Sequence, residues 1–328
     1  MKNIQADIKS GNFKQVYLLY GEEAYLKQQY KQNLVKALNP DGDTMNFNHY
    51  EGKGIDVKQL IDLCETMPFF AERRVVLLED TGFFKNKCEE LADYMKELPD
   101  YLYLVFAETE VDKRNRMYKA VKSCGSIAEF IRQDEKTLMR WAAGILGKAG
   151  KKITQRDMEL LLTKTGTDMG NLRMEMEKLI SYTEGRDVVT AEDIEEICTT
   201  QTTNRIFDMV RAVTEKNQKR ALELYYDLLT LKEPPMRILF LLAKQYRQLL
   251  LAKQFAAAGL AQTEIASKLG VPGFVLRNIT TCARAYTISE LEQAVKDFVD
   301  AEESVKTGRL EDKLSVELLI IKYSSKVK

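Results

Sequence analysis

The sequence predicts a mostly parallel α/β domain followed by two helical domains, and the order of its apolar patterns is the evidence. Residues 1–135 contain short apolar runs that alternate with helical patterns. Because parallel strands need crossover connections, this alternation favours a parallel sheet with right-handed crossovers. Every segment after about residue 134 has helical character, with longer elements near the end of the chain. We therefore expect domains at 1–135, 136–205 and 206–328.

The elements of the first domain follow from runs of apolar residues and from helix-capping residues. Gly21 closes the first run, and Asp56, with Gln59 three residues later, can cap a helix. The predicted strands are Val16–Tyr20, Met45–Tyr50, Arg74–Leu78, Tyr101–Ala107 and Ser126–Phe130, and the helices between them are Glu22–Leu38, the segment after Asp56, Lys85–Leu98 and Lys113–Cys124.

The remaining elements are all expected to be helical. Thr154 with Asp157 and Thr190 with Asp193 resemble capping boxes in which Asp replaces Glu. Pro234-Pro235 divides the last domain, because proline ends a helix. The helical segments predicted there are Asn204–Leu231, Met236–Ala258, 262–269, 272–285, 288–306 and 311–325.

The composition excludes several classes of function. The formal net charge is zero, which argues against a protein that binds nucleic acid alone through bulk electrostatics, although the first domain is slightly acidic and the last slightly basic. Five scattered cysteines suit reduced thiols in a cytoplasm, and His49 is the single histidine, which disfavours histidine-based metal sites and a Ser-His-Asp triad. There is no signal-peptide pattern and no stretch of about 18 apolar residues, so we expect no membrane segment.

A short apolar turn is the most informative feature of the chain. Met67, Pro68, Phe69 and Phe70 end a helical pattern and precede a buried strand. Adjacent phenylalanines at a helix exit cannot easily face one core, so one ring can pack inward while the other stays available to a partner. Burying a ring in a partner's pocket is worth roughly 1.5–3 kcal/mol. The alternative, that both rings belong to the core, has about equal support from physics alone.

No nucleotide-binding loop is expected at the first strand-to-helix turn. A phosphate-binding loop needs a second glycine and a Lys-Ser/Thr pair, which are missing after Gly21. Glu22 and Glu23 stand where phosphate would lie, so electrostatics disfavours ATP. The run Val75–Asp80 resembles a Walker B strand only superficially, and we interpret it as a buried strand with a polar exit.

Three other patterns favour structural roles. Residues 263–279 resemble a helix-turn-helix with Gly270 at the turn, but the second helix is poor in side chains that read bases, so a structural hairpin is the better interpretation. Lys306-Thr307-Gly308 matches one β-lactamase triplet, but the S-x-x-K motif that should accompany it occurs only at Ser325–Lys328, so we dismiss this match. Arg173 is interpreted as a solvated arginine.

Taken together, the chain resembles the delta subunits of the bacterial DNA polymerase III clamp loader over nearly its whole length. Single motifs are loose, but their order and spacing are specific. The residues that carry the resemblance are Tyr17–Glu23, Pro68–Arg74, Asp112–Arg114, Glu175–Leu179, Phe207–Val213, Gln245–Leu250 and Lys306–Arg309.

The resemblance implies an AAA+-like sheet domain with a helical lid, followed by a helical collar that joins tau/gamma and delta prime subunits in a ring. Delta subunits of this family open the beta sliding clamp for loading onto primed DNA and do not hydrolyse ATP. The arginine finger of active relatives is absent, since Ser123-Cys124-Gly125 replaces Ser-Arg-Cys. The resemblance thus implies a non-catalytic subunit of a nucleotidyltransferase holoenzyme, in the cytoplasm at the nucleoid-associated replisome, without cofactor or metal.

The family's clamp-binding segment maps onto Met67, Pro68, Phe69 and Phe70, with Phe69 where leucine is often found. Arg73 and Arg74 flank this segment and are expected to meet acidic residues on the clamp rim. Two alternatives stay open, namely a DNA-binding regulator that uses the 263–279 hairpin and a nucleotide triphosphatase.

Overall fold

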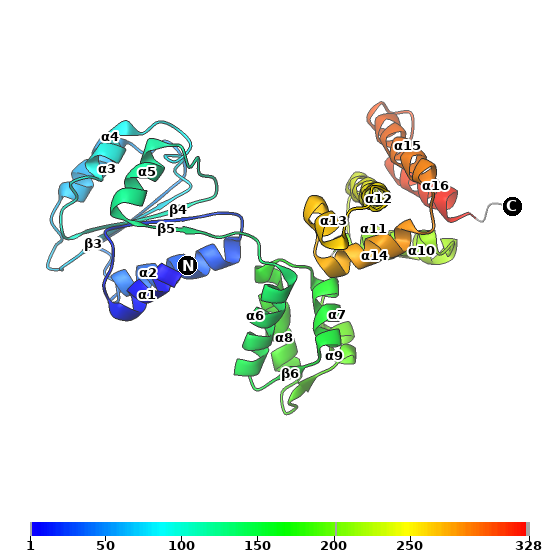
Figure 1. Ribbon diagram of the computed structural model, residues 1–328, viewed down its shortest axis with the longest axis horizontal. Helices are drawn as coiled ribbons and strands as arrows, with labels where there is room; N and C mark the ends of the chain where they lie inside the picture. The colour runs from blue at the N-terminus through cyan, green and yellow to red at the C-terminus, as the bar shows by residue number, and fades with distance from the viewer. Residues whose placement is uncertain (1, 201, 326–328) are drawn as a thin grey trace. The chain divides into compact units, whose positions relative to one another are not determined.

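The structure, a computed structural model, describes residues 2–200 and 202–325, and the chain forms two compact units, 1–133 and 134–328. Figure 1 shows a sheet flanked by helices in the first unit and helices throughout most of the second. The elements of the first unit are α1 (Lys2–Ser10), β1 (Val16–Tyr20), α2 (Ala24–Leu38), β2 (Phe47–Glu51), α3 (Val57–Glu65), β3 (Arg74–Glu79), α4 (Glu89–Tyr94), β4 (Leu102–Glu108), α5 (Arg116–Cys124) and β5 (Ser126–Glu129).

The sheet of the first unit is parallel throughout, with the strand order β2-β3-β4-β1-β5. The α/β sheet that the sequence predicts is therefore confirmed. Alternate residues of each strand enter two cores because successive side chains point to opposite faces. Val16 and Leu18 pack against α3, α4 and α5, whereas Tyr17 and Leu19 pack against α1 and α2. Figure 1 shows these two groups of helices on opposite faces of the sheet.

The second unit is built from helices and one small two-stranded sheet. Its elements are α6 (Glu135–Lys148), β6 (Lys152–Ile153), α7 (Gln155–Thr165), α8 (Met169–Tyr182), β7 (Val188–Val189), α9 (Ala191–Ile197), α10 (Thr202–Thr214), α11 (Gln218–Thr230), α12 (Pro235–Ala257), α13 (Gln262–Leu269), α14 (Gly273–Ala283), α15 (Ile288–Lys306) and α16 (Asp312–Ser324).

The fold differs from the sequence-based expectation in several places, and the helix predicted over Lys85–Leu98 is α-helical only over Glu89–Tyr94. The strands β6 and β7 pair in parallel within a region expected to be only helical. The segment predicted as one helix over Asn204–Leu231 is two helices, because the chain turns at Lys216, whose φ is 56°. The helix α1 was not predicted, and Ile4 anchors it in the core beside α2.

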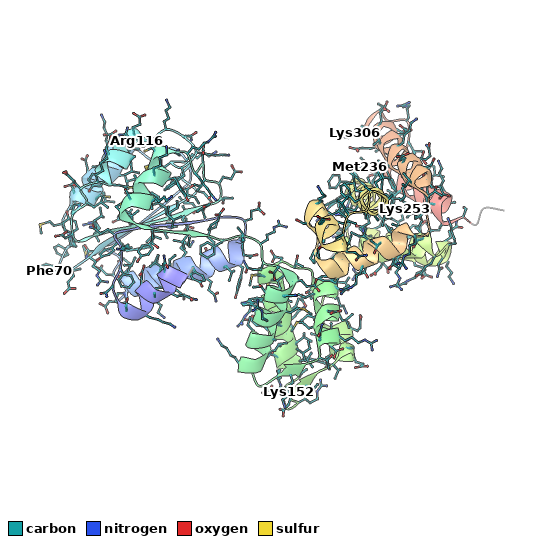
Figure 2. The ribbon with its side chains drawn as sticks, in the orientation of Figure 1. Phe70, Arg116, Lys152, Met236, Lys253 and Lys306 are labelled. Atoms are coloured by element: carbon teal, nitrogen blue, oxygen red, sulfur yellow. The ribbon has the colours of Figure 1, made fainter. Side chains whose placement is uncertain are left out.

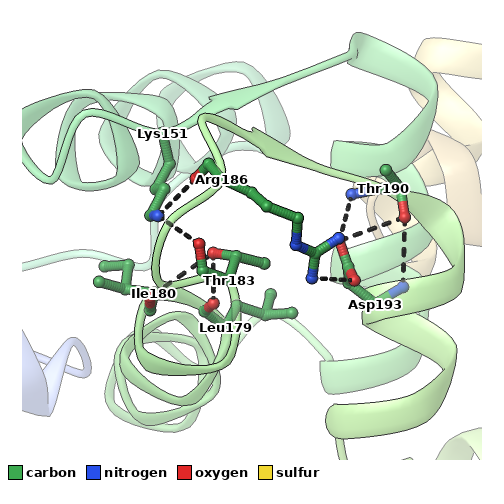
Figure 3. A network of polar contacts seen from close by, with 7 residues as sticks. All are labelled: Lys151, Leu179, Ile180, Thr183, Arg186, Thr190 and Asp193. Carbon is green, nitrogen blue, oxygen red and sulfur yellow. Dashed lines mark hydrogen bonds and ion pairs between the residues drawn. The ribbon is translucent and has the colours of Figure 1, made fainter.

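A polar network holds the small sheet of the second unit in place (Figure 3). Lys151 donates to the carbonyl oxygens of Thr183 and Arg186, each at 2.6 Å, and so ties the start of β6 to the turn after α8. Thr190 and Asp193 form the capping box that the sequence predicts at the start of α9. Arg186 reaches Asp193 at 2.8 Å, which joins the turn to the cap.

Hydrophobic residues of the second unit gather in two clusters. One is formed by α6–α9 together with Phe274 of α14, and the other by α10–α16 around Tyr246. The division into a lid at 136–205 and a collar at 206–328 stays a prediction.

Candidate functional site

The segment between α3 and β3 presents large apolar side chains to solvent. α3 ends at Glu65, and Thr66 leaves the helix in an extended conformation. Beyond it, Met67 is 74% exposed, Phe69 57% and Phe70 96%, while Pro68 is half-buried. Figure 2 shows Phe70 at the periphery of the first unit. Exposed apolar groups that lie together on a surface commonly mark a binding site for another molecule.

Both phenylalanine rings point outward, which corrects the expectation that one of them packs inward. The rings meet edge to face, with centroids 4.5 Å apart and an angle of 82° between their planes. Phe70 has a φ of 50°, in the left-handed region that a bulky residue rarely adopts. The alternative that both rings belong to the core is therefore wrong, and the two rings form one compact apolar tip.

The side chain of Asn46 fixes the backbone just before this tip. Asn46 is only 3% exposed and directly precedes β2. Its Oδ1 accepts from the N–H of Phe69 at 2.6 Å, and its Nδ2 donates to the carbonyl oxygen of Phe69 at 2.9 Å. The same Nδ2 donates to Asp43 at 2.5 Å, and this hydrogen bond, with one from the N–H of Met45, holds the pKa of Asp43 below its usual value.

Arg74 differs from the expectation that it faces a partner. It is only 5% exposed, and its guanidinium donates to the carbonyl oxygens of Thr66 at 2.8 Å and Met67 at 3.1 Å. A third bond reaches Oδ1 of Asn48 at 3.2 Å. Because its guanidinium is used in these internal hydrogen bonds, Arg74 stabilises the backbone of the apolar segment. It is not available to contact a partner.

Arg73 is half-buried and lies over two aromatic rings. Its guanidinium carbon is 5.3 Å from the ring centroid of Phe13 and 5.4 Å from that of Tyr103. Contacts of this kind are cation–π interactions. A role of Arg73 at a partner's rim stays a prediction.

Sequence reasoning missed two neighbours of the segment. Met45 is 65% exposed and lies next to Asn46, so it is a further apolar side chain near the tip. Asn46 itself gives no sequence signal, because an isolated asparagine before a strand is common and its partner is 23 residues away.

The first strand-to-helix turn is packed against the end of β5. Gly21 has a φ of 122°, and a Cβ atom at this position would lie 2.3 Å from the carbonyl oxygen of Phe130. The N–H of Glu23 donates to that same oxygen at 2.9 Å, and Glu23 is buried. A phosphate group bound at this turn would need free backbone N–H donors, but the N–H of Glu23 is already used. The turn therefore lacks the geometry of a nucleotide-binding loop.

The acidic side chains at the carboxyl ends of β3 and β4 each have polar partners from other elements or from the following loop. Glu79 accepts from Lys31 at 2.5 Å and lies 2.9 Å from Nε2 of His49. Glu108 is buried and accepts from Thr81, whose hydroxyl is 2.5 Å away. Burial raises the pKa of Glu108, although the hydrogen bonds from Thr81 oppose this shift. The Walker-B-like run thus ends in ion pairs and loop contacts.

The helical hairpin at residues 263–279 is present, with Gly270 in the left-handed conformation at its turn. Its second helix is packed against other parts of the same unit. Phe274 belongs to the core formed by α6–α9, its N–H donates to Glu135 at 3.3 Å, and Arg277 pairs with Glu159 at 3.5 Å. Because the start of this helix is covered, it is poorly placed to enter a DNA groove.

Other sequence motifs have local structural roles. Arg173 pairs with Glu177 one turn along α8, at 2.7 Å, and Thr307 lies at the end of α15. In the part of the chain that the structure describes, no cluster of three or more His, Cys, Asp or Glu side chains could hold a metal ion. Over the same residues, no helix is both long and apolar enough to cross a membrane.

Comparison with known families identifies the chain. A family model described as DNA polymerase III, delta subunit, matches residues 17–130, and one for the C-terminal domain of the same subunit matches residues 203–323. The chain belongs to the DNA polymerase III delta-subunit family. The first match covers most of the sheet unit with its exposed segment, and the second covers most of α10–α16 in the second unit, so the resemblance predicted from the sequence is confirmed.

Individual relatives agree with this assignment. DNA polymerase III subunit delta of Bacillus subtilis (strain 168) is 26% identical over 332 residues, which cover 97% of this chain and 95% of that protein. The probable DNA polymerase III subunit delta of Aquifex aeolicus (strain VF5) is 22% identical over 276 residues, covering 80% of this chain and 77% of that protein.

A solved structure has the same fold. The Bacillus subtilis DNA clamp loader delta protein superimposes with a TM-score of 0.68 at 23% identity, covering 99% of each chain. The predicted order of a parallel α/β domain followed by helices is therefore confirmed.

Proposed function

We propose that this delta-family chain binds a sliding clamp through Met67, Pro68, Phe69 and Phe70, here called the apolar plug, and opens the clamp for loading onto primed DNA. The single observation that carries the proposal is the exposure of the plug, since Phe70 is 96% exposed beside a second exposed ring. Two adjacent aromatic side chains on a supported backbone suit a hydrophobic pocket on another protein. The name of the Bacillus subtilis structural relative, a DNA clamp loader protein, supports the same assignment.

In this proposal the chain acts by binding the clamp and catalyses no reaction of its own. A protein that binds the open form of a ring more tightly than the closed form shifts the ring toward opening by the ratio of the two affinities. The plug supplies the affinity, and the neighbouring surface of the sheet unit distinguishes open from closed clamp. Hydrolysis of ATP is left to tau/gamma subunits, because the Gly21 turn is filled by the backbone of Phe130.

The other proposed partners follow from membership in the family. The helices at 206–328 join the tau/gamma and delta prime subunits, and contacts with primed DNA are shared with them and go to its backbone. The chain then takes part in a nucleotidyltransferase holoenzyme in the bacterial cytoplasm without supplying a catalytic residue.

A pull-down with the cognate clamp tests the proposal. The double variant Phe69→Ala/Phe70→Ala should bind the purified clamp at least about 30-fold more weakly, because the loss of even one buried aromatic anchor costs about 2 kcal/mol or more. A matched control is Phe240→Ala, which removes an exposed phenylalanine of α12 in the other unit. This control should bind the clamp as the wild type does.

Unchanged clamp affinity in the double variant would reject the plug as the clamp-binding segment. Tight, sequence-specific DNA binding by the isolated chain would instead favour a regulator, and micromolar ATP affinity of the pure chain would favour a nucleotide triphosphatase. Both measurements use the same purified wild-type chain, so the three functions are separated in one set of experiments.

A further inference from the structure

Two buried side chains, Asn46 and Arg74, hydrogen-bond to the backbone of the apolar plug. Asn46 lies just before β2, where its carbonyl oxygen accepts from the N–H of Val75 in β3 at 2.9 Å. Arg74 is the first residue of β3. Both side chains therefore start from backbone that belongs to the sheet, and both reach toward the plug. Asn46 bonds to Phe69, while Arg74 bonds to the carbonyl oxygen of Met67.

The plug needs such support because its own side chains do not provide it. Phe70 touches Phe69 but is otherwise almost wholly exposed, so little packing within the unit fixes its position. Its φ of 50° is unfavourable for a residue with a side chain. Such a backbone conformation persists only where the surrounding structure enforces it. The two hydrogen bonds from Asn46 act on the preceding residue and set the direction in which the chain enters this conformation.

We propose that Asn46 is a positioning residue, which orients the Phe69–Phe70 pair for the clamp before the two proteins meet. This inference rests on the function proposed above and adds a residue outside the plug on which the affinity depends. Asp43 takes part indirectly, because it accepts from Nδ2 of Asn46 and so helps to orient the amide. Neither residue needs to touch the clamp.

Preorganisation is the physical reason for an effect on affinity. A partner that captures a disordered segment must order its backbone and side chains, whereas a held segment has already lost that freedom on folding. Loss of the Asn46 bonds moves the ordering cost from folding to binding. We therefore expect Asn46→Ala to weaken clamp binding by about tenfold, mainly through faster dissociation.

Two readouts on the full chain separate positioning from general stability. Amide hydrogen exchange should accelerate at least about tenfold at Phe69 in Asn46→Ala, because its N–H loses the Oδ1 acceptor, while Val75, which bonds to the backbone of residue 46, should keep its protection. In a double-mutant cycle with Phe70→Ala, the losses in clamp affinity should be far from additive, because Asn46 acts through the ring that the second variant removes.

Two further variants show whether a loss of affinity in Asn46→Ala comes from misfolding or from the general loss of an asparagine side chain. Asp43→Ala leaves Asn46 in place and removes the carboxylate that accepts from its Nδ2 and from the N–H of Met45, so a smaller loss, of about threefold, is expected. Asn115→Ala is the matched control, because Asn115 also bonds to backbone groups, at Phe83, Asn86 and Met117, within the same unit. It should leave clamp affinity unchanged.

The outcomes are distinguishable from a failure of the proposed function. If the wild-type chain does not bind the clamp, the proposed function fails, and the positioning role fails with it. If the wild type binds and Asn46→Ala binds equally well, only the positioning role is overturned. Additive losses in the cycle, or unchanged exchange at Phe69, would likewise overturn it while leaving the plug as the binding segment.

Discussion

Gly21 lies against Phe130 so closely that a side chain at position 21 would overlap the backbone of residue 130. The distance from an ideal Cβ atom to the carbonyl oxygen of Phe130 is 2.3 Å, and that oxygen also accepts from the N–H of Glu23. The contact joins the turn after β1 to the residue that follows β5. It fills the turn at which a phosphate-binding loop would need open space and free backbone N–H groups.

We predict that Gly21→Ala destabilises the first unit by about 2–3 kcal/mol, because both overpacking and an unfavourable positive φ act at this site. Gly54→Ala is the control, since Gly54 has a φ of 95° and a Cβ atom added there would meet no other atom within 4 Å. It should lose only about 1 kcal/mol from the backbone conformation. Amide hydrogen exchange in β1 and β4, which reports the opening free energy of the first unit, measures both values, and equal losses would contradict the role of the Phe130 contact.

The sheet domain could be predicted from sequence because its signals are local. Runs such as Val16–Tyr20 are apolar throughout, and strands buried on both faces of a parallel sheet show this pattern. The apolar plug could also be predicted, since two adjacent phenylalanines at a helix exit cannot easily face one core. The outward direction of both rings was not, because it depends on the φ of Phe70.

The supports of the plug could not be predicted, because they depend on distant parts of the chain. Asn46 and Phe69 meet only after β2 and β3 have paired. An arginine is usually exposed, so the burial of Arg74 could not be expected. It follows from the carbonyl oxygens of Thr66 and Met67, which accept from its guanidinium just after α3. The two-residue strands β6 and β7 are too short to leave an apolar pattern.

We predict different consequences for the two arginines that follow the plug. Arg74→Ala should destabilise the first unit by about 2–3 kcal/mol, because several hydrogen bonds from a buried charge are lost. Arg73→Ala should lose only about 0.5–1 kcal/mol from its contacts with Phe13 and Tyr103. Amide hydrogen exchange in β1 and β4 measures the stability of the first unit, while fluorescence of Trp141, in α6, reports on the second and should not change. A larger loss at Arg73 than at Arg74 would contradict the assignment of Arg74 as the internal support.

We predict that Cys124 reacts faster than the other thiols of the native chain because it is exposed, although desolvation also raises the pKa of its thiol. Cys124 is exposed, whereas Cys64, Cys88, Cys198 and Cys282 are buried. Burial also raises the pKa of Cys64 and of Cys198 to about 12, so these thiols hold little reactive thiolate near neutral pH.

Alkylation with iodoacetamide near neutral pH, followed by mass spectrometry, measures this difference. A single adduct at Cys124 is expected in the native chain and adducts at every cysteine after unfolding. The variant Cys124→Ser should then react slowly in the native state. Rapid modification of Cys64 in the native chain would show that the core beneath α3 opens more easily than its burial indicates.

We predict that Asp193 makes the stability of the second unit depend on pH. Burial by itself raises the pKa of this carboxyl, but hydrogen bonds from Thr190 and Arg186 outweigh burial and hold the pKa below its usual value. A carboxyl whose pKa is lowered by folding stabilises the folded state above its unfolded pKa, near 3.9, and loses this contribution as pH falls through the folded pKa. The variant Asp193→Ala should therefore be less stable at pH 7 by about 2 kcal/mol, from the lost cap and ion pair.

Denaturation followed by Trp141 fluorescence, at pH values from 7 down to about 3, tests the linkage. The difference in unfolding free energy between wild type and Asp193→Ala should be constant near neutral pH and shrink at the acid end. The control is Asp157→Ala, at the equivalent position of the Thr154 cap of α7, where Thr154 donates to Asp157 at 2.7 Å. Because no arginine among the described residues forms an ion pair with Asp157, its substitution should cost less, about 1 kcal/mol or below. Equal losses in the two variants at pH 7 would show that Arg186 adds nothing to the cap, and a difference at Asp193 that persists unchanged to pH 3 would contradict the lowered pKa.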